Sequence, residues 1–328
     1  MRMIHHATTR GGSSPRFNQG GNMMQACEGY CPKDIVRQLD LLGFESRRAC
    51  TPYGAVQFYL SRPTAGRTCT LLLHGVAADA TTWTPMLQCA RELDIDLGNV
   101  LVVDLPGFGR SENRLDTMDI DEVCSMLMGQ VAAAGFERIR LVGHSMGGFL
   151  ALDIASKHPE RVTSVHVAAG AYFGILNAIK APIRSLVRTP RTAILWNSYY
   201  ALCLAGLAGT VAVRAASAVV GPRCVIAPFV AKPARMRRQV VETLITQLNP
   251  RGVVLTARNG PGYNATKTWG AIKVPLTAVF GSADHLVTNK DADELKRTNN
   301  HARIETVQDA GHLMILERPA TVLRALDL

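Results

Sequence analysis

The stretch RIRLVGHSMGGFLAL, residues 138–152, decides the fold. It begins as a short apolar β run, breaks at a G-x-S-x-G turn between Gly143 and Gly147, and continues directly into a helical pattern. Glycines at both ends of the motif let the backbone turn sharply, which exposes the hydroxyl of Ser145. The helix behind it presents unpaired N–H groups and a positive dipole end beside that hydroxyl. The stretch predicts a nucleophilic serine and acyl-transfer chemistry, although a glycine-rich turn with a capping serine fits the motif when it is taken alone.

The length and composition fit a single large hydrophobic core. The chain has 328 residues, 47% of them hydrophobic, which leaves room for an inserted subdomain. Its eight cysteines are scattered without a CxxC pair or a zinc-type spacing, so we expect a reducing compartment and no metal site. We therefore expect a cytoplasmic protein, with peripheral attachment to a membrane as the alternative. Residues 1–24 lack an apolar stretch of signal-peptide length, and we expect them to be a disordered tail.

The positive charge is concentrated in one segment. The net charge of the chain is +10, but residues 171–270 alone hold thirteen basic side chains and a single acidic one, Glu242. This asymmetry predicts that the segment faces an anionic partner, either a membrane surface, an acidic carrier or an anionic substrate. The cluster Arg235-Met236-Arg237-Arg238 lies within it, although a solvated helix face explains such a cluster equally well. No nucleic-acid-binding motif is present, and we expect no nucleic-acid partner.

From residue 54 onward, short apolar runs alternate with helical patterns. This alternation is typical of a mostly parallel sheet with helices on both faces. Besides the strand that begins at Arg138, we expect strands at 54–60, 69–73, 99–103, 162–167, 274–280 and 303–307. We expect helices at 83–93, 119–134, from Ser145 to 157, and from about 319 to 328.

The alternation stops between Gly170 and Ala271. The segment between them is rich in alanine, valine and arginine and contains seven prolines. We expect residues 171–270 to form an inserted helical lid, between core segments at 25–170 and 271–328.

Two further polar residues complete a set with Ser145. A serine nucleophile needs a base to accept its proton and a carboxylate to hold that base in the right tautomer. Asp284 lies just past an apolar strand, where an open α/β sheet places its functional site, and His312 lies just after the last strand. Asp309 is an alternative acid near His312. The chain order Ser145, Asp284, His312 is that of α/β-hydrolases and differs from those of other serine hydrolases.

The chain resembles the α/β-hydrolase superfamily, and within it the lidded serine esterases and lipases. The resemblance covers about residues 54–170 and 274–328. Besides the motif at Ser145, it rests on His74-Gly75, the turn DLPGFGRS at 104–111, Gly311-His312 and Glu317-Arg318-Pro319. It implies an eight-stranded, mostly parallel sheet with helices on both faces and an inserted helical lid.

The resemblance also implies a role for each site residue. Ser145 would be the nucleophile, His312 the base and Asp284 the residue that orients the base. The backbone N–H groups of Val76 and Met146 would form the oxyanion hole. His74 and Gly75 are assigned to substrate binding, although His74 and His144 also fit packing positions beneath the site. The resemblance implies no cofactor and no metal.

An uncharged run from Thr192 to Val213 resembles a transmembrane helix when it is taken alone. A single crossing there would separate Ser145 from Asp284 and His312, which must touch. Two options remain, a buried lid helix that lines an acyl pocket or an interfacial helix that dips into lipid. The polar and small residues in the run favour the buried option.

The function that we expect is cleavage of a carboxylic ester with an apolar acyl group, through an acyl-enzyme. The substrate would be a small-molecule or lipid-like ester. Three alternatives share the same residues: a thioesterase or esterase acting on an acyl chain attached to an acidic carrier, a C–C bond hydrolase, and a ligand receptor derived from a hydrolase.

Overall fold

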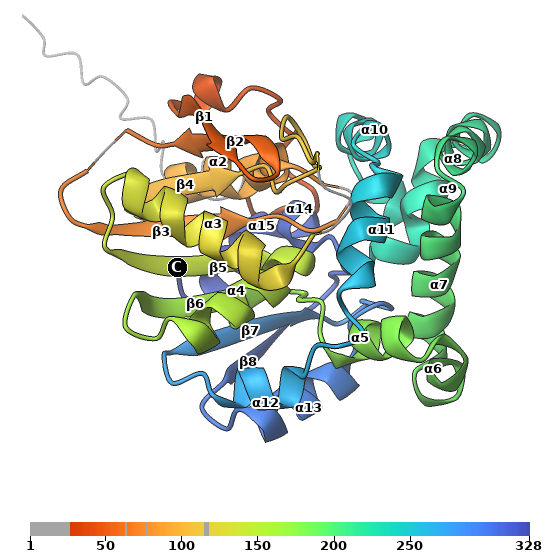
Figure 1. Ribbon diagram of the computed structural model, residues 1–328. Helices are drawn as coiled ribbons and strands as arrows, with labels where there is room; N and C mark the ends of the chain where they lie inside the picture. Colours follow the sequence, from red (N-terminus) through yellow and green to blue (C-terminus); the bar gives the residue numbers. More distant parts are fainter. Residues whose placement is uncertain (1–26, 63, 77, 115–117) are drawn as a thin grey trace, which may run out of the picture.

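The computed structural model describes residues 27–62, 64–76, 78–114 and 118–328 (Figure 1). The tail expected at 1–24 lies outside these residues. One eight-stranded sheet runs through the molecule, in the order β1-β2-β4-β3-β5-β6-β7-β8. Its strands are β1 (Glu45–Thr51), β2 (Gly54–Leu60), β3 (Thr68–Leu73), β4 (Asn99–Val103), β5 (Arg138–His144), β6 (Val162–Ala168), β7 (Leu276–Gly281) and β8 (Arg303–Val307). The pairs β1–β2 and β2–β4 are antiparallel and all others are parallel, as predicted.

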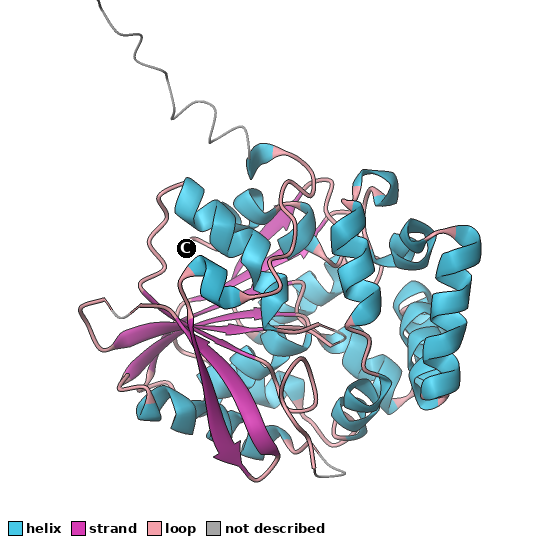
Figure 2. Cartoon of the chain, turned by 90° about the horizontal axis from the view of Figure 1, so that it is seen from above, coloured by secondary structure: helices cyan, strands magenta, loops and turns pink. Residues whose placement is uncertain are grey.

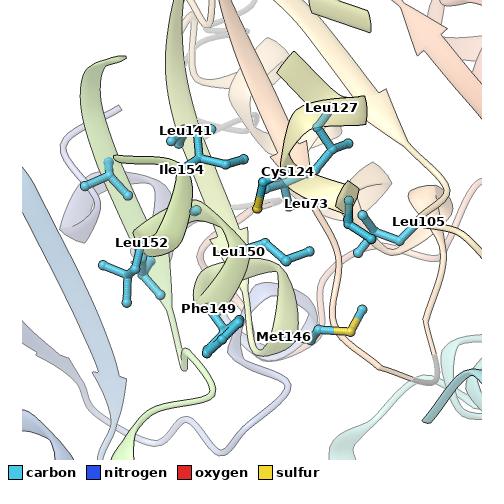
Figure 3. Close-up of a cluster of buried hydrophobic side chains, with 14 of the residues drawn as sticks. Leu73, Leu105, Cys124, Leu127, Leu141, Met146, Phe149, Leu150, Leu152 and Ile154 are labelled. Carbon is cyan, nitrogen blue, oxygen red and sulfur yellow. The ribbon is translucent and has the colours of Figure 1, made fainter. Parts of the chain in front are cut away.

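Helices cover both faces of the sheet. Outside residues 171–270 they are α2 (Thr84–Glu92), α3 (Ile120–Ala133), α4 (Met146–Lys157), α13 (Asn289–Thr298), α14 (Met314–Glu317) and α15 (Pro319–Ala325). Side chains of α3, α4 and α13 join one buried cluster, and side chains of α2, α14 and α15 join a second cluster on the opposite face. Figure 3 shows part of the first cluster, in which Ile154 of α4 lies beside Leu141 of β5 and Leu150 and Phe149 follow towards the start of the helix. Burial of α4 in this way fixes the position of its first residue at the end of β5.

β1 and α13 escaped the sequence analysis because their residues are mostly polar and exposed. β1 is one of the two edge strands, and only Ala49 and Thr51 of its side chains are even partly buried, so it lacks an apolar alternation. α13 buries only Asp291 and Leu295. Its beginning is fixed by a capping box between Thr288 and Asp291.

Between β6 and β7 the chain forms a run of helices (Figure 1). They are α5 (Phe173–Lys180), α6 (Pro182–Arg188), α7 (Pro190–Leu204), α8 (Leu207–Val220), α9 (Pro222–Ile226), α10 (Arg238–Thr246), α11 (Pro250–Arg258) and α12 (Ala265–Gly270). Figure 1 places α6 to α9 at the side of the molecule away from the sheet, beyond α10 and α11, and the view from above shows only helices at that side (Figure 2).

The sequence favoured a single buried helix for the uncharged run from Thr192 to Val213, but the structure does not form one. The run is divided between α7 and α8, which bend by 117° at a break where Gly206 has a φ of 56°. A positive φ is readily adopted by glycine, so Gly206 is what allows the chain to change direction there. Among the described residues, no single helix is both long and apolar enough to cross a membrane, whereas the bent pair α7 and α8 passes that test together.

Buried polar contacts attach this run of helices to the sheet domain. The hydroxyl of Tyr263 donates a hydrogen bond of 2.9 Å to Asp153 of α4, and it accepts one of 3.0 Å from the indole N–H of Trp269. At the other end, the Asp291 carboxylate accepts a hydrogen bond of 2.7 Å from the backbone N–H of Gly174 in α5. Both ends of the run are therefore fixed near the carboxyl ends of the strands.

Candidate active site

Ser145 occupies a strained turn between β5 and α4. Its φ is 53°, in the left-handed region that non-glycine residues rarely adopt. The turn is possible because Gly143 and Gly147 pack backbone against backbone. A Cβ on Gly147 would overlap the carbonyl oxygen of Leu73, and one on Gly143 would overlap that of Gly147. The glycines thus hold the Ser145 hydroxyl at the carboxyl end of the sheet.

The structure brings Ser145, His312 and Asp284 together. The Nε2 atom of His312 lies 3.0 Å from the Oγ atom of Ser145, and its Nδ1 atom lies 3.0 Å from Oδ2 of Asp284. Because an ionised carboxylate can only accept, the proton of the neutral ring sits on Nδ1, and Nε2 is free to accept from the serine hydroxyl. All three side chains are buried.

Asp284 is fixed by the turn that carries it. Its Oδ1 atom accepts hydrogen bonds from the backbone N–H groups of Leu286 (2.8 Å) and Val287 (3.0 Å), while Oδ2 faces His312. Asp309, the alternative acid, is exposed and forms ion pairs with Lys232 (2.6 Å) and Arg318 (3.3 Å). The geometry thus brings Asp284 to His312, and Asp309 faces away from it.

His144 supports the loop that carries His312. Its Nε2 atom lies 2.8 Å from the carbonyl oxygen of His312, and the two ring centroids are 5.3 Å apart. Burial lowers the pKa of His144 to about 3, so the ring is neutral near pH 7 and Nε2–H donates to that carbonyl. The position just before the serine was the only signal for this residue in the sequence.

Val76 and Met146 lie beside Ser145 and line the same cavity. Met146 is the first residue of α4, so its N–H is one of those without an intrahelical acceptor. Within the described part of the chain, the N–H of Val76 makes no hydrogen bond either. Gly75, which precedes Val76, can approach Ser145 closely because it has no side chain. A Cβ on Gly75 would lie 2.9 Å from the Cβ of Ser145.

His74 and Gly75 lie behind Ser145 and outside the cavity wall. His74 is fully buried, its Nδ1–H donates to the carbonyl of Gly75 (2.7 Å), and its Nε2 accepts from the N–H of Leu105 (3.0 Å). Neither nitrogen is left for a substrate. The substrate-binding role expected for His74 is thus replaced by a structural one, because both of its hydrogen-bonding positions are used within the protein.

A cavity of about 330 Å³ opens beside Ser145. Its walls come mainly from α7, α8, α9 and α10 and are almost entirely apolar; they include Leu195, Trp196, Tyr199, Leu202, Val213, Ile226, Leu244 and Ile245. A second, smaller cavity of about 60 Å³ lies on the side of α4 and α5, lined by Phe149, Leu150, Ile175 and Leu176. Val76, Ser145 and Trp196 line both cavities, so the serine lies where they meet.

Sequence reasoning missed most of these wall residues. The uncharged run from Thr192 to Val213 indicated a pocket, but it could not tell which side chains face inward. Among the described residues, no group of three or more His, Cys, Asp or Glu side chains is arranged to hold a metal ion.

The family model for the alpha/beta hydrolase fold matches residues 71–319, and the chain belongs to this family. The chain is 26% identical over 262 residues to a dihydrolipoyllysine-residue acetyltransferase component of an acetoin cleaving system from Pseudomonas putida, a match that covers 77% of this chain and 60% of the relative. It is also 30% identical over 123 residues to a 2-hydroxy-6-oxononadienedioate/2-hydroxy-6-oxononatrienedioate hydrolase from Paraburkholderia phymatum, covering 37% of this chain and 43% of the relative. The chain thus spans less than two thirds of the length of these relatives.

Solved structures agree with the fold. A thermophilic esterase from Thermogutta terrifontis superposes with a TM-score of 0.62 at 20% identity, covering 86% of this chain and 97% of the esterase. At this identity the likeness concerns the fold. The family model therefore identifies the chain as an α/β-hydrolase, and the solved structure shares its fold.

Proposed function

We propose that this protein is a serine hydrolase that cleaves carboxylic esters with an apolar acyl group. The observation that carries the proposal is the pair of 3.0 Å contacts that joins Ser145, His312 and Asp284 at the mouth of an apolar cavity. Neutral His312, with its proton on Nδ1, is arranged to accept the serine proton at Nε2. This arrangement suits acyl transfer through a covalent intermediate.

In the first half of the proposed reaction, the Oγ atom of Ser145 attacks the ester carbonyl carbon as its proton passes to Nε2 of His312. The N–H groups of Val76 and Met146 stabilise the negative oxygen, each by roughly 3 kcal/mol. When the carbon–oxygen bond of the ester breaks, His312 gives its proton to the leaving alcohol. Asp284 holds the ring and stabilises its positive charge throughout.

In the second half, a water molecule replaces the alcohol. His312 accepts a proton from the water as it attacks the acyl-enzyme, and the bond to Ser145 Oγ breaks as the serine regains a proton. The products are the carboxylic acid and the free enzyme.

The wall chemistry favours an apolar acyl group over a charged one. Among the described residues that line the two cavities, none is a lysine or an arginine. A dianionic substrate such as the one in the name of the Paraburkholderia relative would be buried there without a counter-charge, which is costly. A thioester with an apolar acyl chain fits the same site and is the second candidate that the cavity supports.

The first test of this proposal is Ser145→Ala. We expect hydrolysis of a nitrophenyl ester series to fall by roughly a millionfold, as for nucleophiles of other serine hydrolases. Labelling by a fluorophosphonate probe should also disappear, while the thermal midpoint stays near that of the wild type. Several per cent of residual activity in purified protein would refute the role of Ser145. Multiple turnovers after any burst would separate an enzyme from a single-turnover receptor.

The second test compares two aspartates. Asp284→Asn should keep the contacts but favour the wrong tautomer of His312, lowering turnover by roughly ten-thousandfold. Asp309→Asn is the matched control, because Asp309 forms only exposed ion pairs with Lys232 and Arg318. We expect little change in turnover there. A severe loss in Asp309→Asn with an active Asp284→Asn would reverse the assignment of the acid.

A further inference from the structure

The outward sides of α6, α7 and α8 form an exposed apolar surface. Of the eleven large hydrophobic side chains that are exposed among the described residues, all but Leu41 lie on these three helices. We call them the outer apolar face: Ile183, Leu186, Val187, Ile194, Leu202, Leu204, Leu207, Val211, Val219 and Val220. Such a concentration marks an interaction surface, because soluble surfaces normally carry such side chains singly.

Exposed arginines lie on the same three helices as this face. Arg184 and Arg188 of α6, Arg191 of α7 and Arg214 of α8 are exposed, and in the described part of the chain no acidic side chain pairs with them. The only acidic residue between 171 and 270, Glu242, pairs with Arg238 at 2.6 Å. The helices of the outer apolar face thus carry uncompensated positive charge.

The cluster at 235–238, which the sequence singled out, has partners of its own. Arg237 forms an ion pair with Asp34 at 2.6 Å, Arg238 pairs with Glu242, and Arg235 lies 5.9 Å from the ring centroid of Tyr30. Arg235 and Arg237 thus contact the N-terminal segment, whereas the pair of Arg238 lies within α10. The arginines of α6, α7 and α8 therefore carry charge that is available to an external partner.

We propose that the outer apolar face binds the surface of an anionic membrane. Apolar side chains flanked by arginines suit the boundary between acyl chains and negatively charged head groups. A second copy of the chain is a poorer occupant, because a two-fold interface would bring the arginines of both copies together. An acidic carrier would match the charge but would leave side chains such as Val187 and Leu207 against a polar partner.

The same helices separate the membrane-binding surface from the cavity. Tyr199 of α7 and Thr210 and Val213 of α8 line the cavity beside Ser145, and neighbouring residues of both helices form the outer apolar face, whose Leu202 reaches the cavity as well. If the proposed function holds, an ester embedded in the bilayer has only this layer of helices to pass on its way to the serine. Membrane binding itself rests on the surface alone and does not depend on catalysis.

Vesicle sedimentation tests the surface. We expect the full chain to bind vesicles of equimolar phosphatidylglycerol and phosphatidylcholine, and to bind pure phosphatidylcholine much less. The triple variant Val187→Glu, Leu207→Glu and Val219→Glu should lose binding at least roughly tenfold, since it places charge where insertion is required. These side chains are 85%, 80% and 84% exposed and line neither cavity, so the fold and hydrolysis of a short soluble ester should be unchanged. Leu41→Glu, 70% exposed but outside the insertion, is the matched control and should bind normally.

The charge requirement is tested separately. Changing Arg184, Arg188, Arg191 and Arg214 together to Gln should weaken binding at low salt by roughly fivefold per arginine near the surface, and high salt should reproduce that loss in the wild type. The control has the same change of charge at four exposed arginines elsewhere: Arg62, Arg91, Arg138 and Arg297. Equal losses in both quadruple variants would overturn the proposal. So would a wild type that ignores anionic vesicles, or a dimer in solution that the triple variant dissociates.

Discussion

Asp104 illustrates how one buried carboxylate shapes the loops around the site. It follows β4 and accepts hydrogen bonds from the backbone N–H groups of Ala80 (2.8 Å) and Arg110 (2.9 Å), and from the hydroxyl of Tyr59 (3.3 Å). It thereby holds together the loops that follow β3 and β4. Burial raises the pKa of Asp104 to about 6, because desolvation outweighs these hydrogen bonds.

This pKa predicts a pH dependence of stability. Between about pH 4 and about pH 6 the folded state keeps the proton of Asp104 while the unfolded state loses it, so this residue's contribution falls as the pH rises. Relative to Asp104→Asn, the free energy of unfolding of the wild type should fall by up to about 3 kcal/mol across that interval. Urea titrations of both proteins at several pH values measure the difference. A difference that stays constant with pH would contradict the shift.

At this scale the sequence predicted Ser145, Asp284 and His312 because each follows an apolar strand in a recognisable local motif. It favoured Asp284 for its place after a strand and kept Asp309 as the alternative acid. That choice depends on which carboxylate the turn points at His312, and Lys232 from a distant segment engages Asp309. The substrate-binding role of His74 failed for a similar reason, since its partner Leu105 comes from another loop.

Among the elements, α7 and α8 pack closely at their junction. Gly209 is buried, and a Cβ there would overlap the carbonyl oxygen of Leu202. The two helices can cross this closely only because position 209 lacks a side chain. Gly209 and Leu202 both line the large cavity, so the crossing also sets the shape of its wall.

Gly209→Ala should therefore push α7 and α8 apart and lower the free energy of unfolding by roughly 1–3 kcal/mol. We expect hydrolysis of long-chain esters to fall more than that of acetyl esters, since only the longer chains reach this wall. Gly129→Ala is the control, because Gly129 is exposed in α3 with open space around it. It should raise stability by about 0.5–1 kcal/mol and leave the acyl-length profile unchanged. A parallel decline for all chain lengths in Gly209→Ala would argue against its role in the wall.

The elements that the sequence predicted best are those whose side chains are buried on a regular period. The strands around Ser145 read as apolar runs because helices cover both of their faces. β1 and α13 carry mostly exposed polar residues, so no buried period marks them in the sequence. β1 is fixed by its pairing with β2, and the start of α13 is fixed by its capping box. The division between α7 and α8 depends on the positive φ of Gly206, which no apolar pattern encodes.

Over the whole molecule, three distant parts of the chain meet at Glu317. This fully buried carboxylate accepts hydrogen bonds from the hydroxyl of Tyr30 (2.7 Å) and from the backbone N–H groups of Ala231 (2.8 Å) and Gly311 (3.0 Å). Burial raises its pKa above the ordinary value. One side chain thus connects the N-terminal segment, the insertion and the loop that carries His312.

The last prediction concerns this connection. Glu317→Ala would leave three buried donors without an acceptor, and we expect it to lower the free energy of unfolding by about 3 kcal/mol or more. Because Gly311 precedes His312, the loop should shift, so kcat should fall roughly tenfold to a hundredfold while KM changes little. Glu317→Gln keeps one acceptor oxygen and should lose much less of both. Tyr30→Phe removes one donor far from His312, so it should reduce stability without lowering kcat. A Glu317→Ala protein that is destabilised but retains the wild-type kcat would show that the His312 loop holds its position without Glu317.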